Sequence, residues 1–168
     1  SRDESLYQQQ FRDTYEALGA IVSIVTLFDD NQTIDTQRHL LQHADIIYVG
    51  GGHYPLLVQR LALKGMDVLL EQAVKRGTWY VGVSAGAIYP MEYGIRTSED
   101  GMDYCLDMGQ GWLSGCLCPH SNQEKRATRF QEYLPQMESA IGLPDDTAYI
   151  LSGTDHYRLG EGHALYGR

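Results

Sequence analysis

The sequence is poor in cysteine and lacks the patterns of a membrane or secreted chain. Three of its 168 residues are cysteine, an odd and sparse set that fits a reducing compartment better than a disulfide framework. It contains no apolar run of about 18 residues, so no membrane span is predicted. The N-terminal SRDESLYQQQ lacks the basic-then-apolar pattern of a signal peptide. We therefore expect a cytoplasmic protein with no membrane partner.

Positive charge is also scarce. Lys and Arg number 13 against 22 Asp and Glu, which gives a net charge of −9. This balance disfavours non-specific binding to nucleic acid, so no nucleic-acid partner is expected. Hydrophobic residues make up 43% and charged residues 21%, an ordinary globular mixture that excludes a disordered chain. The length predicts one domain, 1–168.

Helical and strand patterns alternate along the chain. Helices are predicted at 7–18, 33–44, from 55 onward, at 66–76 and at 123–139. Buried strands are predicted at 20–27 and 45–49, and further strands at 78–83 and 112–118. The stretch 92–110 reads as irregular, and 148–151, 156–159 and 163–167 read as short terminal strands. The alternation predicts an α/β fold with a mostly parallel sheet between helices. Because such folds begin with a strand and this chain begins on a helix, we expect an N-terminal strand to be missing.

A Gly-x-Ser-x-Gly motif carries the sharpest functional signal. Gly82, Ser84 and Gly86 follow the predicted strand 78–83 and precede a short predicted helix. A nucleophile elbow has this arrangement: the tight turn requires small flanking residues and lifts the serine Oγ out of the carboxyl edge of the sheet. The motif alone equally fits a glycine-rich turn in which serine caps a helix. Ser84 is therefore a candidate nucleophile.

Three successive glycines, 50–52, end the strand 45–49. Loops at the carboxyl ends of neighbouring parallel strands share one crevice, and a glycine run brings backbone N–H groups close to a ligand. The N–H groups near Gly51 and Gly52, with that of Ala85, are the candidate oxyanion hole. A tight turn or a phosphate cradle is the alternative, although no phosphate-binding pattern follows. His53, directly after the glycines, is a candidate substrate contact.

A nucleophilic serine needs a base, and the base needs an orienting partner. Of the six histidines, His120 is the best candidate because it follows a strand at a further strand-to-helix junction. Asp100 is the predicted orienting carboxylate, with Glu99 as the runner-up. Either acid fits a solvated loop equally well.

No metal or cofactor is predicted. His39 and His43 lie four residues apart on a helix, but no acidic third ligand accompanies them, so an exposed helix face is the preferred interpretation. Cys116 and Cys118 form a C-x-C with no second pair and are interpreted as strand residues.

Four motifs together resemble the peptidase E (aspartyl dipeptidase) family of serine peptidases, to which cyanophycinases are related. They are VGGG (49–52), GVSAGA (82–87), IRTSED (95–100) and CPH (118–120). The resemblance implies a three-layer αβα sandwich of the flavodoxin-like, class I glutamine amidotransferase-like kind, whose first strand this chain lacks. It implies Ser84 as nucleophile, His120 as base and Asp100 as third member, with Gly51, Gly52 and Ala85 in the oxyanion hole.

The implied substrate is a short peptide, and the family preference for an N-terminal aspartate would require a local cation. Arg126 and Arg129 follow His120 on the predicted helix, and Arg126 matches the family arginine by approximate alignment; a solvated helix face is the alternative for both. The chain departs from the family at His53 and Ile88, where asparagine is frequent, and the resemblance implies that both positions lie beside the nucleophile.

Three hypotheses follow. The first is a cytoplasmic serine peptidase acting through an acyl-enzyme, with a homodimer left open. The second is a catalytically inactive amidotransferase-like binding or regulatory domain, in which His53 and Ile88 have closed the site. The third is an α/β-hydrolase esterase, ranked last because only 36 residues (120 − 84) separate Ser84 from His120, too few for the elements that such a fold places there.

Overall fold

A computed structural model of the chain describes residues 2–28, 32–160 and 165–166. It divides into two compact units, residues 1–44 and 45–168, which are described separately. The expectation of a single domain over 1–168 stays a prediction.

The first unit contains two helices, α1 (Arg2–Glu16) and α2 (Ile34–His43). Both were predicted, and Thr33 caps α2 by accepting a hydrogen bond from the N–H of Thr36 at 3.2 Å. The predicted strand 20–27 is wrong, because residues 20–28 form no strand. Their carbonyls accept hydrogen bonds from side chains instead of a neighbouring strand: Arg12 bonds Val22, and Gln37 bonds Thr26.

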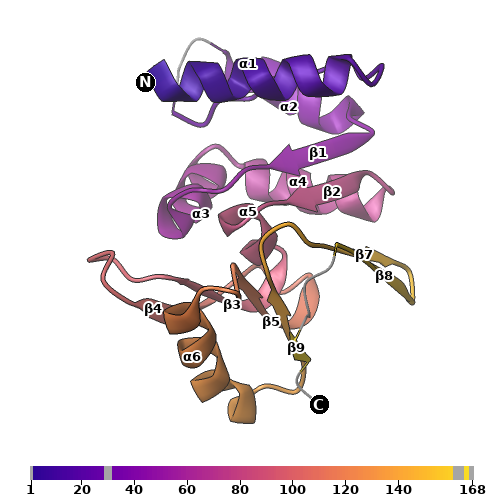
Figure 1. Ribbon diagram of the computed structural model, residues 1–168. Helices are drawn as coiled ribbons and strands as arrows, with labels where there is room; N and C mark the ends of the chain where they lie inside the picture. Colours follow the sequence, from indigo (N-terminus) through magenta and orange to yellow (C-terminus); the bar gives the residue numbers. More distant parts are fainter. Residues whose placement is uncertain (1, 29–31, 161–164, 167–168) are drawn as a thin grey trace. The chain divides into compact units, whose positions relative to one another are not determined.

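The second unit opens with a parallel strand pair and its helices (Figure 1). The elements are β1 (Ile46–Val49), α3 (Tyr54–Leu63), α4 (Met66–Lys75), β2 (Trp79–Gly82) and the single turn α5 (Ala85–Ile88). Val49 pairs with Gly82 at the carboxyl ends of the two strands. The loops that carry Gly50–Gly52 and Ser84 therefore leave the sheet at the same edge, as predicted.

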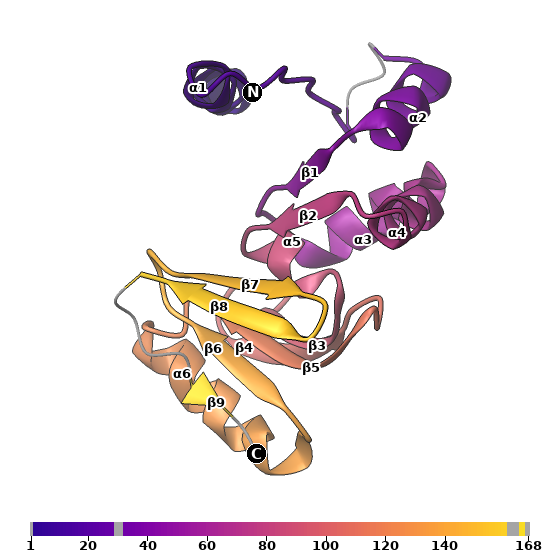
Figure 2. The ribbon, with the colours of Figure 1, turned by 90° about the vertical axis from the view of Figure 1, so that its right-hand side faces the viewer.

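A five-stranded sheet follows, in the order β4-β3-β5-β6-β9 among the described residues (Figure 2). Its strands are β3 (Met91–Thr97), β4 (Tyr104–Met108), β5 (Leu113–Pro119), β6 (Ala140–Leu143) and β9 (Leu165–Tyr166). The pairs β3–β5 and β5–β6 are parallel, whereas β3–β4 and β6–β9 are antiparallel. The prediction of an irregular 92–110 is wrong, since that stretch forms most of the β3–β4 hairpin.

Helix α6 (Glu124–Tyr133) packs against β4 and β5. It is shorter than predicted because a 3-10 turn, η1 (Leu134–Gln136), replaces it at Pro135, whose ring is incompatible with a continuing helix. Phe130 buries its ring completely among Ile95, Cys116, Cys118 and Ala140. The last elements are β7 (Ala148–Ser152) and β8 (Asp155–Leu159), an antiparallel hairpin as predicted.

The described residues include all three cysteines and every helix that could be checked for a membrane span. None of their helices is both long and apolar enough to cross a membrane. All three cysteines are free: Cys116 and Cys118 are buried, and Cys105 is half-buried.

Candidate active site

Ser84 lies at a sharp turn between β2 and α5. Its φ of 53° and ψ of −110° fall outside the ordinary region for a non-glycine residue. The turn is possible because glycine stands on both sides: a Cβ on Gly82 would lie 2.3 Å from the carbonyl oxygen of Gly86, and one on Gly86 would lie 2.0 Å from that of Val49. Backbone packed this closely leaves no room for a side chain. The local geometry is that of a nucleophile elbow.

His120 meets Ser84 from the end of β5. Its Nε2 lies 3.0 Å from Ser84 Oγ, and its φ of 55° turns the chain sharply after Pro119. Pro119 pairs with Leu143 in the parallel register of β5 and β6, so the loops that follow these two strands begin side by side. The structure thus brings together the serine and the histidine that the sequence singled out.

Asp145, in the loop after β6, occupies the other side of the imidazole. Its Oδ1 is hydrogen-bonded to His120 Nδ1. Hydrogen bonds from His120 and then Asn122 hold the pKa of the Asp145 carboxyl below its ordinary value, so it is ionised and can only accept. His120 Nδ1 therefore carries the proton, and Nε2 is free to accept from the Ser84 hydroxyl.

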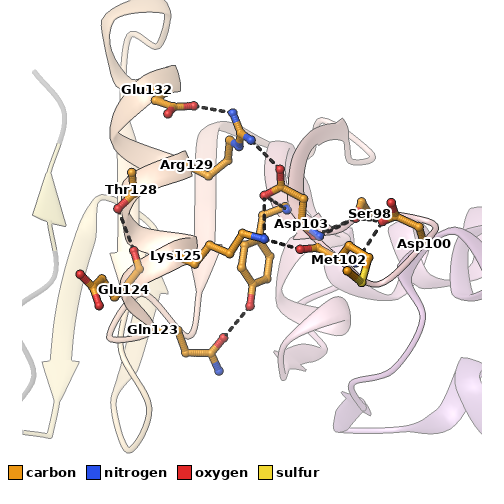
Figure 3. Close-up of polar contacts among 11 residues, drawn as sticks. Ser98, Asp100, Met102, Asp103, Gln123, Glu124, Lys125, Thr128, Arg129 and Glu132 are labelled. Carbon is orange, nitrogen blue, oxygen red and sulfur yellow. Dashed lines mark hydrogen bonds and ion pairs between the residues drawn. The ribbon is translucent and has the colours of Figure 1, made fainter.

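The predicted orienting acid, Asp100, lies elsewhere. It sits in the turn between β3 and β4, where its Oδ1 accepts from Ser98 Oγ at 2.6 Å and from the Met102 N–H at 3.0 Å (Figure 3). Glu99, the runner-up, lies 3.3 Å from Arg96 and 3.6 Å from His53. Asp145, and neither of these acids, is the carboxylate bonded to His120. Asp100 accepts its hydrogen bonds from neighbours in the turn, so this loop does not supply the carboxylate that contacts His120.

Asp145 was missed because its strand was missed. The short run Ala-Ile-Gly-Leu (140–143) follows the predicted helix 123–139 and was assigned to no element, so the Pro-Asp-Asp after it was not placed at a carboxyl edge. A four-residue apolar run ended by a turn was the available signal, since buried parallel strands are often this short.

Gly51 packs directly against the nucleophile. A Cβ there would lie 3.1 Å from Ser84 Cβ and 3.7 Å from Ser84 Oγ, so the glycine backbone reaches the reacting atom. Gly52 has a φ of 137° with open space around it, so conformation rather than room favours glycine there. Ala85 is the first residue of α5, and its N–H has no acceptor within that helix. Gly51 and Ala85 therefore lie directly beside Ser84, and Gly52 is the next residue after Gly51.

The two predicted substrate contacts differ in exposure. His53 is exposed, caps α3 by accepting from the Leu56 N–H at 3.3 Å, and borders an open depression of about 570 Å³ with Pro55, Leu56 and Gln59. Arg126 is only 6% exposed; it donates to the Pro119 carbonyl at 2.9 Å and to Thr97 Oγ1 at 3.2 Å.

Ile88 does not enter the site. Its side chain is 2% exposed and packs on Gly94 of β3, where an added Cβ would lie 2.4 Å from Ile88 Cγ2. Ile88 therefore fills the core between α5 and β3. Among the described residues, no group of three or more His, Cys, Asp or Glu side chains is placed to bind a metal.

Known proteins similar in sequence to this chain are named as peptidases. The chain is 33% identical over 125 residues to an uncharacterized peptidase, YgaJ, of Bacillus subtilis (strain 168), which covers 74% of this chain and 53% of that protein. It is 26% identical to peptidase E of Haemophilus influenzae over 172 residues, covering 95% of this chain and 76% of that one. The chain thus spans about half the length of the Bacillus relative.

Solved structures show the same fold. A crystal structure of a peptidase from an acI-B1 Actinobacterium superposes with a TM-score of 0.63 at 20% identity, covering 98% of this chain and 78% of that one. A candidate peptidase E protein from Listeria monocytogenes EGD-e gives 0.71 at 19% identity, covering 90% and 76%. The predicted α/β fold class is confirmed. Because the model of Peptidase family S51 matches residues 1–158, the chain belongs to peptidase family S51.

Proposed function

We propose that this chain is a serine peptidase that cleaves short peptides through an acyl-enzyme, with Ser84, His120 and Asp145 as its catalytic residues. The observation that carries the proposal is the hydrogen-bonded series from Asp145 through His120 to Ser84 Oγ. A serine hydroxyl is a weak nucleophile at its own pKa, and a base oriented by a third group activates it.

The reaction proceeds in two displacements. Ser84 Oγ attacks the scissile carbonyl while His120 Nε2 takes the hydroxyl proton, and Asp145 stabilises the imidazolium that forms. His120 then gives that proton to the leaving amine, and the C–N bond breaks. Water, deprotonated by His120, attacks the acyl-enzyme ester; the acid is released and the proton returns to Ser84.

The oxyanion of each tetrahedral intermediate is proposed to accept from the N–H of Ala85 and from backbone N–H groups at Gly51 and Gly52. In other enzymes one such donor is worth about 3–4 kcal/mol of transition-state stabilisation. The close packing of Gly51 on Ser84 supports this placement.

Dipeptides that begin with aspartate are the proposed preferred substrates. Arg126 is the cation that we assign to the aspartate carboxylate, because it follows His120 on α6 and its planar fork suits bidentate carboxylate binding. His53 is the second residue that we assign to substrate contact, because it is exposed and borders an open depression. We also propose a cytoplasmic location, because free cysteines fit a reducing compartment.

Two measurements test the proposal. Wild-type protein should be labelled by a fluorophosphonate probe at Ser84 and should hydrolyse Asp-X dipeptides faster than Ala-X dipeptides. Ser84→Ala should abolish labelling, and both Ser84→Ala and His120→Ala should lower turnover by at least about 10³-fold. A well-folded wild-type protein that neither labels nor hydrolyses any peptide would instead favour the non-catalytic binding domain.

A further inference from the structure

The structure assigns a positioning role to Asn122: we propose that its side-chain amide holds Asp145 in the orientation that His120 requires. The inference rests on the proposed function, because this orientation matters for catalysis only if His120 is the base. Asn122 lies in the turn between β5 and α6, two residues after His120.

Both ends of the amide contact Asp145. Asn122 Oδ1 accepts from the Asp145 backbone N–H at 3.0 Å, and Asn122 Nδ2 donates to Asp145 Oδ2 at 3.1 Å. A backbone N–H can only donate and an ionised carboxylate can only accept, so the orientation of the amide is fixed by its partners. Each carboxylate oxygen then has its own donor: Oδ2 has Asn122, and Oδ1 has His120.

Asp145 needs such support because its surroundings are open. Its side chain is 46% exposed, and the next residue, Asp146, has a φ of 58°. Among the described residues, the carboxylate's other side-chain hydrogen bond is the one to His120 itself. Without Asn122, Asp145 would be free to rotate into water, and His120 would lose the acceptor that fixes its tautomer.

The amide also joins the loops that carry the two residues. The Ser121 N–H donates to the Leu143 carbonyl at 3.2 Å at the start of these loops, and the Asn122–Asp145 pair extends the connection to the imidazole. Among the described residues, the ionisable groups that act on the Asp145 carboxylate are His120 and Arg126. Asn122 is thus the neutral side chain that donates a hydrogen bond to the Asp145 carboxylate.

Two variants and a matched control test the role. Asn122→Ala removes the amide, and Asn122→Asp keeps its shape but replaces the donor with an anion. Gln123→Ala is the control: Gln123 is exposed in the same turn and accepts from Tyr104 at 3.1 Å, away from Asp145. Turnover is measured per active site titrated with the fluorophosphonate, so that unfolded protein does not count.

We expect Asn122→Ala to lower kcat by about 10–100-fold per titrated site, the size of effect that small misplacements produce, with KM changed less than about twofold. Asn122→Asp should also move the acidic limb of the kcat/KM profile to higher pH, because the added carboxylate stabilises the His120 imidazolium. Gln123→Ala should match wild type. An Asn122→Ala enzyme whose kcat per site stays within about twofold of the control overturns the proposal, as does a loss confined to the number of titrated sites.

Proton NMR separates this proposal from the proposed function. The His120 Nδ1 proton, assigned by its loss in His120→Gln, should exchange with water faster in Asn122→Ala than in Gln123→Ala, whether or not the wild type hydrolyses peptides. Equal exchange rates in the two variants would refute the positioning role, while absent wild-type labelling would refute only the peptidase.

Discussion

Ser84 combines the proposed nucleophile with an unfavourable backbone. Its φ of 53° and ψ of −110° are conformations that cost a non-glycine residue of order 1–3 kcal/mol and that cluster at active sites. Glycine accepts this conformation, although its greater freedom in the unfolded chain offsets roughly 0.5–1 kcal/mol of the gain. We therefore expect Ser84→Gly to unfold with a free energy about 1 kcal/mol larger than Ser84→Ala.

Urea denaturation of the two variants measures this difference. Both lose the hydroxyl and its hydrogen bond to His120, so the comparison isolates the backbone. A Ser84→Ala protein as stable as Ser84→Gly would mean that the turn is unstrained.

Asp145 and Asp100 make a second test at the scale of single residues. The carboxylate bonded to His120 fixes its tautomer, and exchanging such an acid for the amide lowers kcat by about 10⁴-fold in a related triad. We expect Asp145→Asn to lower kcat/KM by roughly 10³–10⁴-fold. Asp100→Asn should change kcat/KM by less than about threefold, because the amide oxygen can still accept the hydrogen bonds from Ser98 and Met102.

The substrate for this comparison is the best-cleaved dipeptide of the wild type. The reverse ranking, with Asp100→Asn the more damaging, would return the orienting role to the β3–β4 turn.

At the scale of elements, the sequence pattern predicted those whose periodicity is local. Capping residues, glycines and apolar runs correctly predicted helices α2, α3 and α4 and strands β1, β2 and β5. The prediction that 92–110 is irregular was wrong because its polar residues pair across two strands: Arg96 forms an ion pair with Asp107 across the β3–β4 hairpin. Such cross-strand pairs involve residues 11 apart and leave no local apolar pattern.

Helix α6 depends on one aromatic side chain. Phe130 is fully buried between the helix and the sheet, against Ile95 and Cys118. The other face carries ion pairs, such as Arg129 with Asp103 and Glu132 (Figure 3). Removing a buried phenylalanine leaves a cavity, so we expect Phe130→Ala to lower the free energy of unfolding by about 3–5 kcal/mol.

Thr128→Ala provides the control for α6, because Thr128 is exposed and its hydroxyl donates to the Glu124 carbonyl of its own helix. Its effect should stay within about 0.5 kcal/mol. A loss under about 1 kcal/mol for Phe130→Ala would show that α6 is not anchored through this ring.

At the scale of the whole molecule, three of the four motifs meet at Ser84, although they come from two sheets. VGGG and GVSAGA end the paired parallel strands β1 and β2, and their shared edge was predictable from the alternation of helix and strand. CPH ends β5 of the five-stranded sheet and reaches Ser84 through His120. The fourth motif, IRTSED, begins in β3 and ends in the turn before β4, where Asp100 accepts its hydrogen bonds from residues of the same turn. The pairing of Asp145 with His120 depends on a β5–β6 register that a single sequence does not contain.

The 45–168 unit should unfold as a whole in alkali, because it buries phenols around the elbow. Tyr80 donates to the Gly86 carbonyl and Tyr54 to the Met108 carbonyl, each at 2.7 Å, and Tyr89 packs edge-on against Trp112. Burial raises the pKa of Tyr54 to about 12, and burial raises the pKa values of Tyr80 and Tyr89 above the ordinary value as well.

The unfolded chain releases phenol protons near pH 10, so above that pH it binds fewer protons than the folded chain and stability falls. Each phenol contributes about 1.4 kcal/mol per pH unit until its folded pKa is reached, or roughly 4 kcal/mol per unit for three. Since domains are stable by only about 5–15 kcal/mol, we expect unfolding at roughly pH 11–12. Phenolate absorbance at 295 nm should rise in one step with the loss of far-UV circular dichroism. Tyr80→Phe should make that step shallower, whereas Tyr157→Phe, at an exposed position, should leave it unchanged. Ionisation of the buried phenols in a protein that is still folded would disprove the coupling, because their hydroxyls would then reach water without unfolding around the elbow.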